Sequence, residues 1–73
     1  MNASEAREKT NEIIKSNMEN LFRRINNAIE DQNFKIEVNE ELCNFTQIKI
    51  LRDLNYKVDW NEFTKIVTIS WAD

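Results

Sequence analysis

The residues able to do chemistry in this 73-residue chain are few. Cys43 is its only cysteine and histidine is absent, so the thiol lacks the usual base of a nucleophilic dyad and the serines lack a triad partner. The same counts exclude a zinc site of Cys and His ligands. A chain without glycine also cannot form a Gly-rich phosphate loop. We predict no catalytic residue, no metal site and no cofactor, and we expect Cys43 to be a small buried apolar residue.

Paired carboxylates remain as candidates for acid–base or cation chemistry. Glu40 and Glu41 are adjacent, and Asp59 and Glu62 are close in the sequence. Such pairs can hold a divalent cation or act as an acid and a base. Adjacent acids at a helix start are more typical of partners for the helix dipole and of solvated surface. We therefore expect a protein that is not an enzyme.

Basic side chains offer one positive signal. Arg23 and Arg24 are adjacent in the first predicted helix, and Lys49 and Arg52 lie in the second. Arginine suits bidentate capture of phosphate, so copies of Arg23 and Arg24 in an oligomer could converge on a small anionic nucleotide ligand. The alternative is a solvated basic face with acidic neighbours.

Composition restricts the partners and the compartment. The net charge of −3 has the wrong sign for broad attachment to nucleic-acid phosphates, so nonspecific nucleic-acid binding is not expected. No apolar run is long enough for a signal peptide or a membrane span, and a lone cysteine fits a reducing cytoplasm. The absence of Gly and Pro, with many Asn, Ile and Lys, indicates an AT-rich coding sequence, as in a low-GC bacterium or its phage.

The first element is a long amphipathic helix, predicted over residues 3–32. Asn2 or Ser4 caps its start and Asn33 ends it. Its apolar face is formed by Ile14, Met18, Leu21, Ile25 and Ala28, and is widened by Ile13, Phe22 and Ile29. This face either covers a sheet alone or is shared between the core and an oligomer contact.

The length of this helix exceeds the size of the domain. It spans more than about 40 Å, whereas a globule formed by the single domain 1–73 is about 29 Å across. Residues 1–12 therefore overhang, and they either fray or lie along a partner subunit.

Three strands and a second helix follow. Residues 34–38 alternate as a strand with one apolar face, and residues 56–60 and 66–71 form a hairpin around the turn "NEFT". A helix is predicted over 45–54, with Asn44 and Gln47 as a capping box and Asn55 as its left-handed end. It starts either there or after a turn of its own from residue 40.

These elements predict an α+β fold of order αβαββ. A right-handed crossover between the first two strands, with the β-branched third strand between them, gives a three-stranded mixed sheet of order 1-3-2. Both helices pack on the apolar face, and the other face is polar.

Four apolar side chains are candidate contacts. Trp60 and Trp71 fall on the inward side of their strands, so they fill the core or lie half exposed at a contact near the turn and the chain end. Phe63 lies in the turn and Ile66 points to the polar face. An exposed apolar pair of this kind would suit a subunit contact.

The ending "LNYKVDW…KIVTISW" carries a resemblance. It is similar to the L-G-Y-x-V, short hairpin and T-I-S-W ending of small tailed-phage proteins, which have a helix and a short strand before it. The similarity covers about residues 25–71. Asn55 stands where Gly is usual, a change that the left-handed conformation tolerates, and the long first helix is a second departure. The resemblance implies a phage origin and no catalytic residue.

Three functions are consistent with these observations. The first is a phage effector in the cytoplasm of the infected bacterial cell that binds a host protein stoichiometrically, in counter-defence or host takeover. The second is a homo-oligomer that sequesters a host nucleotide signal between subunits, through Arg23, Arg24 and the aromatic residues. The third is a minor structural component of the virion.

Overall fold

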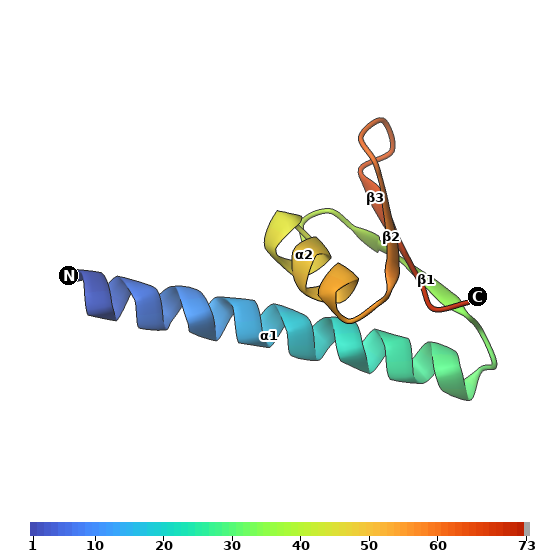
Figure 1. The fold of residues 1–73 in the computed structure, drawn as a ribbon, viewed down its shortest axis with the longest axis horizontal. Coiled ribbons are helices and arrows are strands. Elements are labelled where there is room, and N and C mark those ends of the chain that lie inside the picture. The colour runs from blue at the N-terminus through green and yellow to red at the C-terminus, as the bar shows by residue number, and fades with distance from the viewer. Residues whose placement is uncertain (73) are drawn as a thin grey trace.

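The chain forms an α+β fold in the predicted element order, αβαββ (Figure 1). The structure is a computed structural model that describes residues 1–72. Its elements are α1 (Ala3–Glu30), β1 (Lys35–Asn39), α2 (Phe45–Asp53), β2 (Lys57–Asn61) and β3 (Ile66–Ser70). The strand order β1-β3-β2 is the one predicted.

The sheet is antiparallel rather than mixed. β3 pairs antiparallel with both β1 and β2. β1 and β2 run in the same direction, as a crossover requires, but β3 separates them, so the expectation of a mixed sheet was wrong. The register places Ile69 between Ile36 and Val58, and Val67 between Val38 and Trp60. These residues share one face of the sheet.

Asparagine and glutamine side chains fix where the helices begin. The Oδ1 of Asn2 accepts from the Glu5 N–H at 2.9 Å, which makes Asn2 the cap of α1. The predicted capping box of α2 is present: Asn44 Oδ1 accepts from the Thr46 N–H at 3.0 Å, and Gln47 Oε1 accepts from the Asn44 N–H at 3.2 Å. These bonds satisfy backbone donors that a helix start leaves free.

Both helices end in a left-handed residue. Asn55 has φ 72°, as predicted, and the Tyr56 N–H closes the turn on the Leu51 carbonyl at 3.0 Å. In α1 the left-handed residue is Gln32, with φ 63°, and not the predicted Asn33. The Asn33 N–H instead closes the same type of turn on the Ala28 carbonyl at 2.8 Å. Asparagine is the more common of the two residues at a left-handed position, so the residue type alone gave the end of α1 one residue too late.

The core lies between the two helices and the apolar face of the sheet. Its buried side chains are Met18, Leu21, Ile25, Val38, Cys43, Ile48, Leu51, Val58, Val67 and Ile69. Phe22 is partly buried against them, but Ile13 and Ile29 are 62% and 52% exposed, so the packed face of α1 is narrower than predicted.

The first turns of α1 extend beyond the rest of the molecule (Figure 1). The molecule measures 45 × 29 × 18 Å, and every residue from 1 to 13 is exposed. The core begins to cover α1 only from Ile14 and Met18 onward. Among the described residues, no helix combines the length and the apolar character needed to cross a membrane.

The β2–β3 hairpin turn contains a strained position at Lys65. Its φ is 60°, and its N–H donates to the Asn61 carbonyl at 2.8 Å. A left-handed conformation costs a non-glycine residue about 1–2 kcal/mol. Glycine avoids this cost, but it loses more conformational entropy on folding, which cancels part of the gain. We expect Lys65→Gly to raise the free energy of unfolding in urea by about 0.5–1 kcal/mol, and Lys65→Ala to give no such gain. An unchanged or lower urea midpoint for Lys65→Gly would contradict the assigned turn.

Candidate functional site

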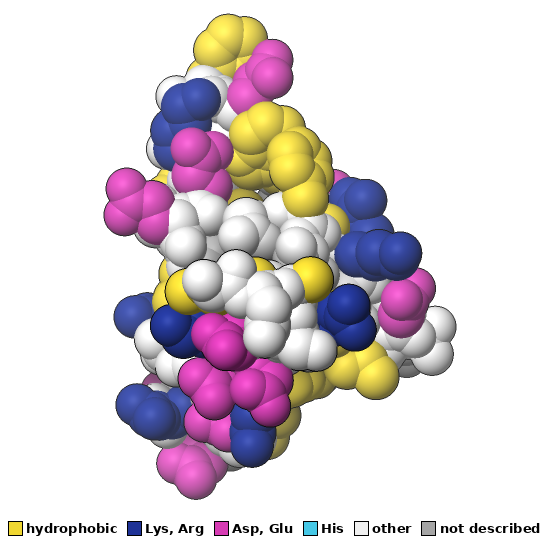
Figure 2. Space-filling model, turned by 90° about the vertical axis from the view of Figure 1, so that its left-hand side faces the viewer, with side chains coloured by type: hydrophobic (Ala, Val, Ile, Leu, Met, Phe, Trp, Pro, Cys, Tyr) yellow, Lys and Arg dark blue, Asp and Glu magenta, His cyan; other side chains and the backbone are white. Residues whose placement is uncertain are grey.

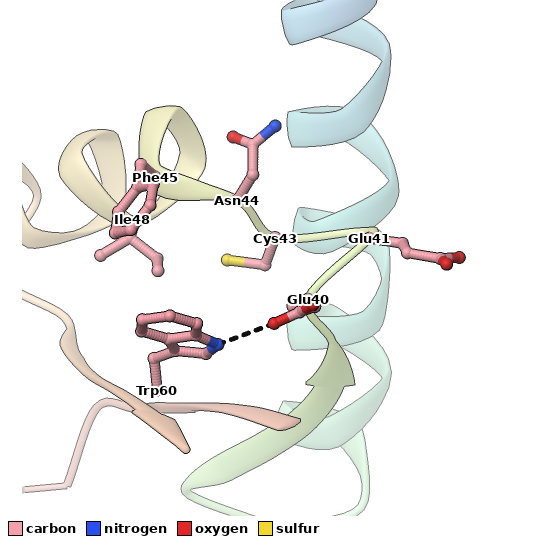
Figure 3. A pocket seen from close by; sticks show the side chains of 7 residues that line it. All are labelled: Glu40, Glu41, Cys43, Asn44, Phe45, Ile48 and Trp60. Atoms are coloured by element: carbon pink, nitrogen blue, oxygen red, sulfur yellow. Dashed lines mark hydrogen bonds between the residues drawn. The ribbon is translucent and has the colours of Figure 1, made fainter. Parts of the chain in front are cut away.

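A cleft opens between the loop after β1, the start of α2 and the end of β2 (Figure 3). We call it the aromatic cleft, and its volume is about 290 Å³. It is lined by Glu40, Glu41, Cys43, Asn44, Phe45, Ile48 and Trp60. The capping box of α2 positions one side of the cleft and the pairing of β2 with β3 positions the other, so two rigid elements shape it.

Phe45 forms one wall of the cleft. It is the first residue of α2 and continues the buried stripe of Ile48 and Leu51 by one helical turn. It is nevertheless 76% exposed, although Cys43, Gln47 and Ile48 around it are buried, because its ring lies at the open side of the cleft. The Phe45 ring meets the Trp60 ring edge-on, with 5.6 Å between the ring centroids and an angle of 73° between the planes. This is a favourable aromatic geometry.

Trp60 forms the opposite wall. Its side chain lies on the inward face of β2, opposite Val67, yet it is 41% exposed. Its Nε1–H donates to Glu40 Oε2 at 3.0 Å (Figure 3). The hydrogen bond satisfies the indole donor and restricts the orientation of the ring. Trp60 therefore presents a held aromatic surface at the mouth of the cleft.

Trp71 lies at the other end of the sheet. It is half-buried against the core and meets Tyr56 edge-on at 6.2 Å between ring centroids. Its backbone N–H donates to the Phe34 carbonyl at 2.9 Å. The two tryptophans share an inward parity, but the structure does not bring them together.

Phe63 and Ile66, predicted as an exposed pair, differ in exposure. Phe63 is 91% exposed at the tip of the β2–β3 hairpin, whereas Ile66 is half-buried on the face of the sheet away from the helices. Phe63 and Trp60 line a second, shallow depression together with Asp59, Asn61, Glu62 and Thr68. Hydrophobic side chains gather at the hairpin tip and again below it (Figure 2). We call Phe45, Trp60 and Phe63 the aromatic surface.

The two arginines lie elsewhere. Arg23 and Arg24 are both exposed on α1. Arg24 lines a depression whose other charged residues are Glu37 and Glu41. The guanidinium of Arg24 therefore shares its surroundings with carboxylates, and neither arginine lines the aromatic cleft.

Cys43 forms part of the cleft wall and is fully covered by the protein, with 0% of its surface exposed. Burial raises the pKa of its thiol from 9.0 to about 11, because desolvation penalises the thiolate. The thiol is therefore protonated at neutral pH, and the expectation of a small buried side chain is confirmed.

The raised pKa of Cys43 predicts a loss of stability at alkaline pH. Between pH 9 and about 11 the unfolded chain has released the thiol proton while the folded chain still holds it, so the free energy of unfolding falls as pH rises through this range. We expect Cys43→Ala to lose less stability than the native protein over the same range, as measured by urea unfolding at each pH. Identical pH dependences would contradict the desolvated thiol.

Phe45 and Ile48 were not predicted as site residues, and Glu40 was considered only as one of a pair of adjacent carboxylates. The signal that could have identified Phe45 is its place directly after the capping residue Asn44, where a large apolar side chain lies at the open end of the helix. The bond from Trp60 to Glu40 joins residues 20 positions apart in the sequence, so no local pattern predicts it.

Within residues 1–72, no group of three or more His, Cys, Asp or Glu side chains is placed to hold a metal ion. Searches with family models, curated proteins and solved structures find no match to this chain.

Proposed function

We propose that this chain is a non-catalytic, phage-type effector that binds a host protein stoichiometrically in the cytoplasm of the infected bacterial cell. The observation that carries the proposal is the aromatic surface. Phe45, Trp60 and Phe63 are 76%, 41% and 91% exposed and lie around one end of the molecule.

Large exposed aromatic side chains are the usual anchors of protein interfaces. Binding energy concentrates in a few residues, among which Trp and Tyr are enriched, and apolar patches with a polar rim mark interaction sites. Trp60 is held by its bond to Glu40 and by its contact with Phe45. Less side-chain entropy is therefore lost when a partner covers it.

The cleft chemistry supports binding rather than turnover. The thiol of Cys43 is protonated at neutral pH because its pKa is raised to about 11, so it is a poor nucleophile. One oxygen of Glu40 already accepts the Trp60 indole hydrogen bond.

A site-specific photo-crosslink tests the proposal. A photoreactive phenylalanine analogue at position 63 is expected to capture one host protein in infected cells, and the purified pair is expected to form a complex of fixed stoichiometry by native mass spectrometry. The control is the same analogue at Phe34, which is 64% exposed but precedes β1.

Two outcomes would contradict the proposal. The first is the same adducts from positions 34 and 63, and the second is capture of virion proteins alone, which would favour a structural component of the particle.

We also propose self-association through the exposed part of α1. Residues 1–13 are uncovered, and Ile13 is 62% exposed within this polar segment. Native mass spectrometry of the purified protein tests this proposal, because a monomer at all concentrations would contradict it. A retained mass of nucleotide size would instead favour the sequestering function.

A further inference from the structure

We infer that the partner presents a basic amphipathic helix to the aromatic surface, inserting a bulky apolar side chain into the aromatic cleft. This inference rests on the proposed function and names the chemistry of the partner. Three features of the site carry it: the sign of its charges, the size of the cleft and the edge of the strand beside it.

The charged residues that line the two hollows of the aromatic surface are acidic. In the aromatic cleft the Glu40 carboxylate meets Trp60, whereas the Glu41 side chain points away from Trp60 (Figure 3) and lines a depression with Arg24. The adjoining depression is lined by Asp59 and Glu62. Among the described residues that line these two hollows, none is Lys or Arg. Charge complementarity across interfaces steers encounter and suppresses partners of like charge, so the complementary surface is rich in Lys or Arg.

Glu40 connects the charged and the aromatic parts of the site. Its Oε2 accepts from the indole N–H of Trp60 at 3.0 Å, so the carboxylate is fixed at the mouth of the cleft (Figure 3). A carboxylate has further acceptor positions on both oxygens. A Lys or Arg beside the inserted apolar side chain would therefore meet an oriented carboxylate.

The size of the cleft suits a single bulky side chain. Its volume of about 290 Å³ lies at the lower limit of ligand pockets, which measure about 300–1,000 Å³ and enclose most of their ligand. Its walls, Phe45, Ile48 and Trp60, are apolar. Helices that dock in such places present bulky apolar residues every third or fourth position.

The free edge of β2 is unsuited to the addition of an extended strand. β2 is an edge strand that pairs with β3 on one side. The Arg52 guanidinium donates from Nη2 to the carbonyl of Val58 in this strand at 2.8 Å. A partner strand pairing along this edge would compete with that bond. Insertion of side chains from a helix leaves it in place.

Synthetic peptides test the inference directly. Two peptides of about 15 residues carry the same leucines at helical spacing and differ only in having Lys or Glu at the other positions. Binding is followed by the fluorescence of Trp60 in the Trp71→Phe protein, which leaves Trp60 as its single tryptophan. We expect the Lys peptide to bind at least about tenfold more tightly than the Glu peptide at low salt, and the difference to shrink at high salt.

Matched charge variants locate the effect. Glu40→Gln with Glu62→Gln removes two charges at the site and keeps an acceptor for Trp60, so the Lys peptide should bind about five- to tenfold more weakly. Glu30→Gln with Asp31→Asn removes two charges at the far end of α1, and affinity should change by less than about twofold.

Several results would overturn the inference. They are equal binding of the Lys and Glu peptides, equal losses from the two charge variants, and undiminished binding of a Lys peptide whose leucines are replaced by serine. Self-association that depends on Phe45 and Trp60, measured by sedimentation, would also overturn it, because a second copy would then be the occupant. The crosslink at position 63 reports separately on the proposed function: a captured host protein with no preference for the Lys peptide refutes the inference alone.

Discussion

The double variant Phe45→Ala with Trp60→Ala is expected to lose partner binding while the protein remains folded. Truncating interface anchors of this type costs at least about 2 kcal/mol, which is about a 30-fold loss of affinity. Neither side chain belongs to the core cluster, and their exposed fractions are 76% and 41%. Affinity is measured with the captured partner by calorimetry, and folding by circular dichroism.

Two controls separate binding from folding in this experiment. Phe34→Ala truncates another exposed phenylalanine, 64% exposed and before β1, and it should leave affinity unchanged. Trp60→Phe keeps an aromatic ring but removes the donor to Glu40, so an intermediate loss is expected. Retention of full affinity by the folded double variant would show that the aromatic surface is not the binding site.

Leu51→Ala is expected to have the largest effect on stability. The side chain is fully buried in the core cluster, and a Leu→Ala change at such a site costs about 2–5 kcal/mol. A domain of 73 residues has a total stability of only about 4–11 kcal/mol. We therefore expect the free energy of unfolding in urea to fall by about half, with a measurable unfolded population in water.

Leu54→Ala is the matched control for this change. Leu54 is the residue directly after α2 and is 53% exposed, so the same truncation removes little buried surface and should cost less than about 1 kcal/mol. Equal losses from the two variants would contradict the assignment of the inward face of α2.

Much of the fold was predictable because its signals are local. The spacing of Met18, Leu21 and Ile25 determined the buried face of α1. The pair Asn44 and Gln47 determined where α2 begins. The alternation within three short segments predicted the strands, and the β-branched residues of the third strand placed β3 in the middle. The antiparallel pairing of β2 with β3 was predicted correctly. The description of the sheet as mixed was wrong, since the crossover joins β1 and β2, which do not pair with each other.

The candidate site was predictable only in part, because periodicity gives the direction in which a side chain points and not the fraction of it that other residues bury. Trp60 and Trp71 have the same inward parity, but Trp60 lies toward the hairpin tip and stays 41% exposed, while Trp71 packs on Tyr56. Phe45 continues a buried stripe and is still 76% exposed.

The sequence by itself determined the elements, the capping box and left-handed end of α2, the central stripe of the buried face of α1 and the scarcity of nucleophiles, since these follow from residue types and short spacings. Only the tertiary structure decided that Phe45, Glu40 and Trp60 meet in one cleft. Their contacts join the start of α2, the loop after β1 and the end of β2. The physical reason is that a contact between segments far apart in the sequence depends on where each helix or strand ends relative to the elements packed beside it.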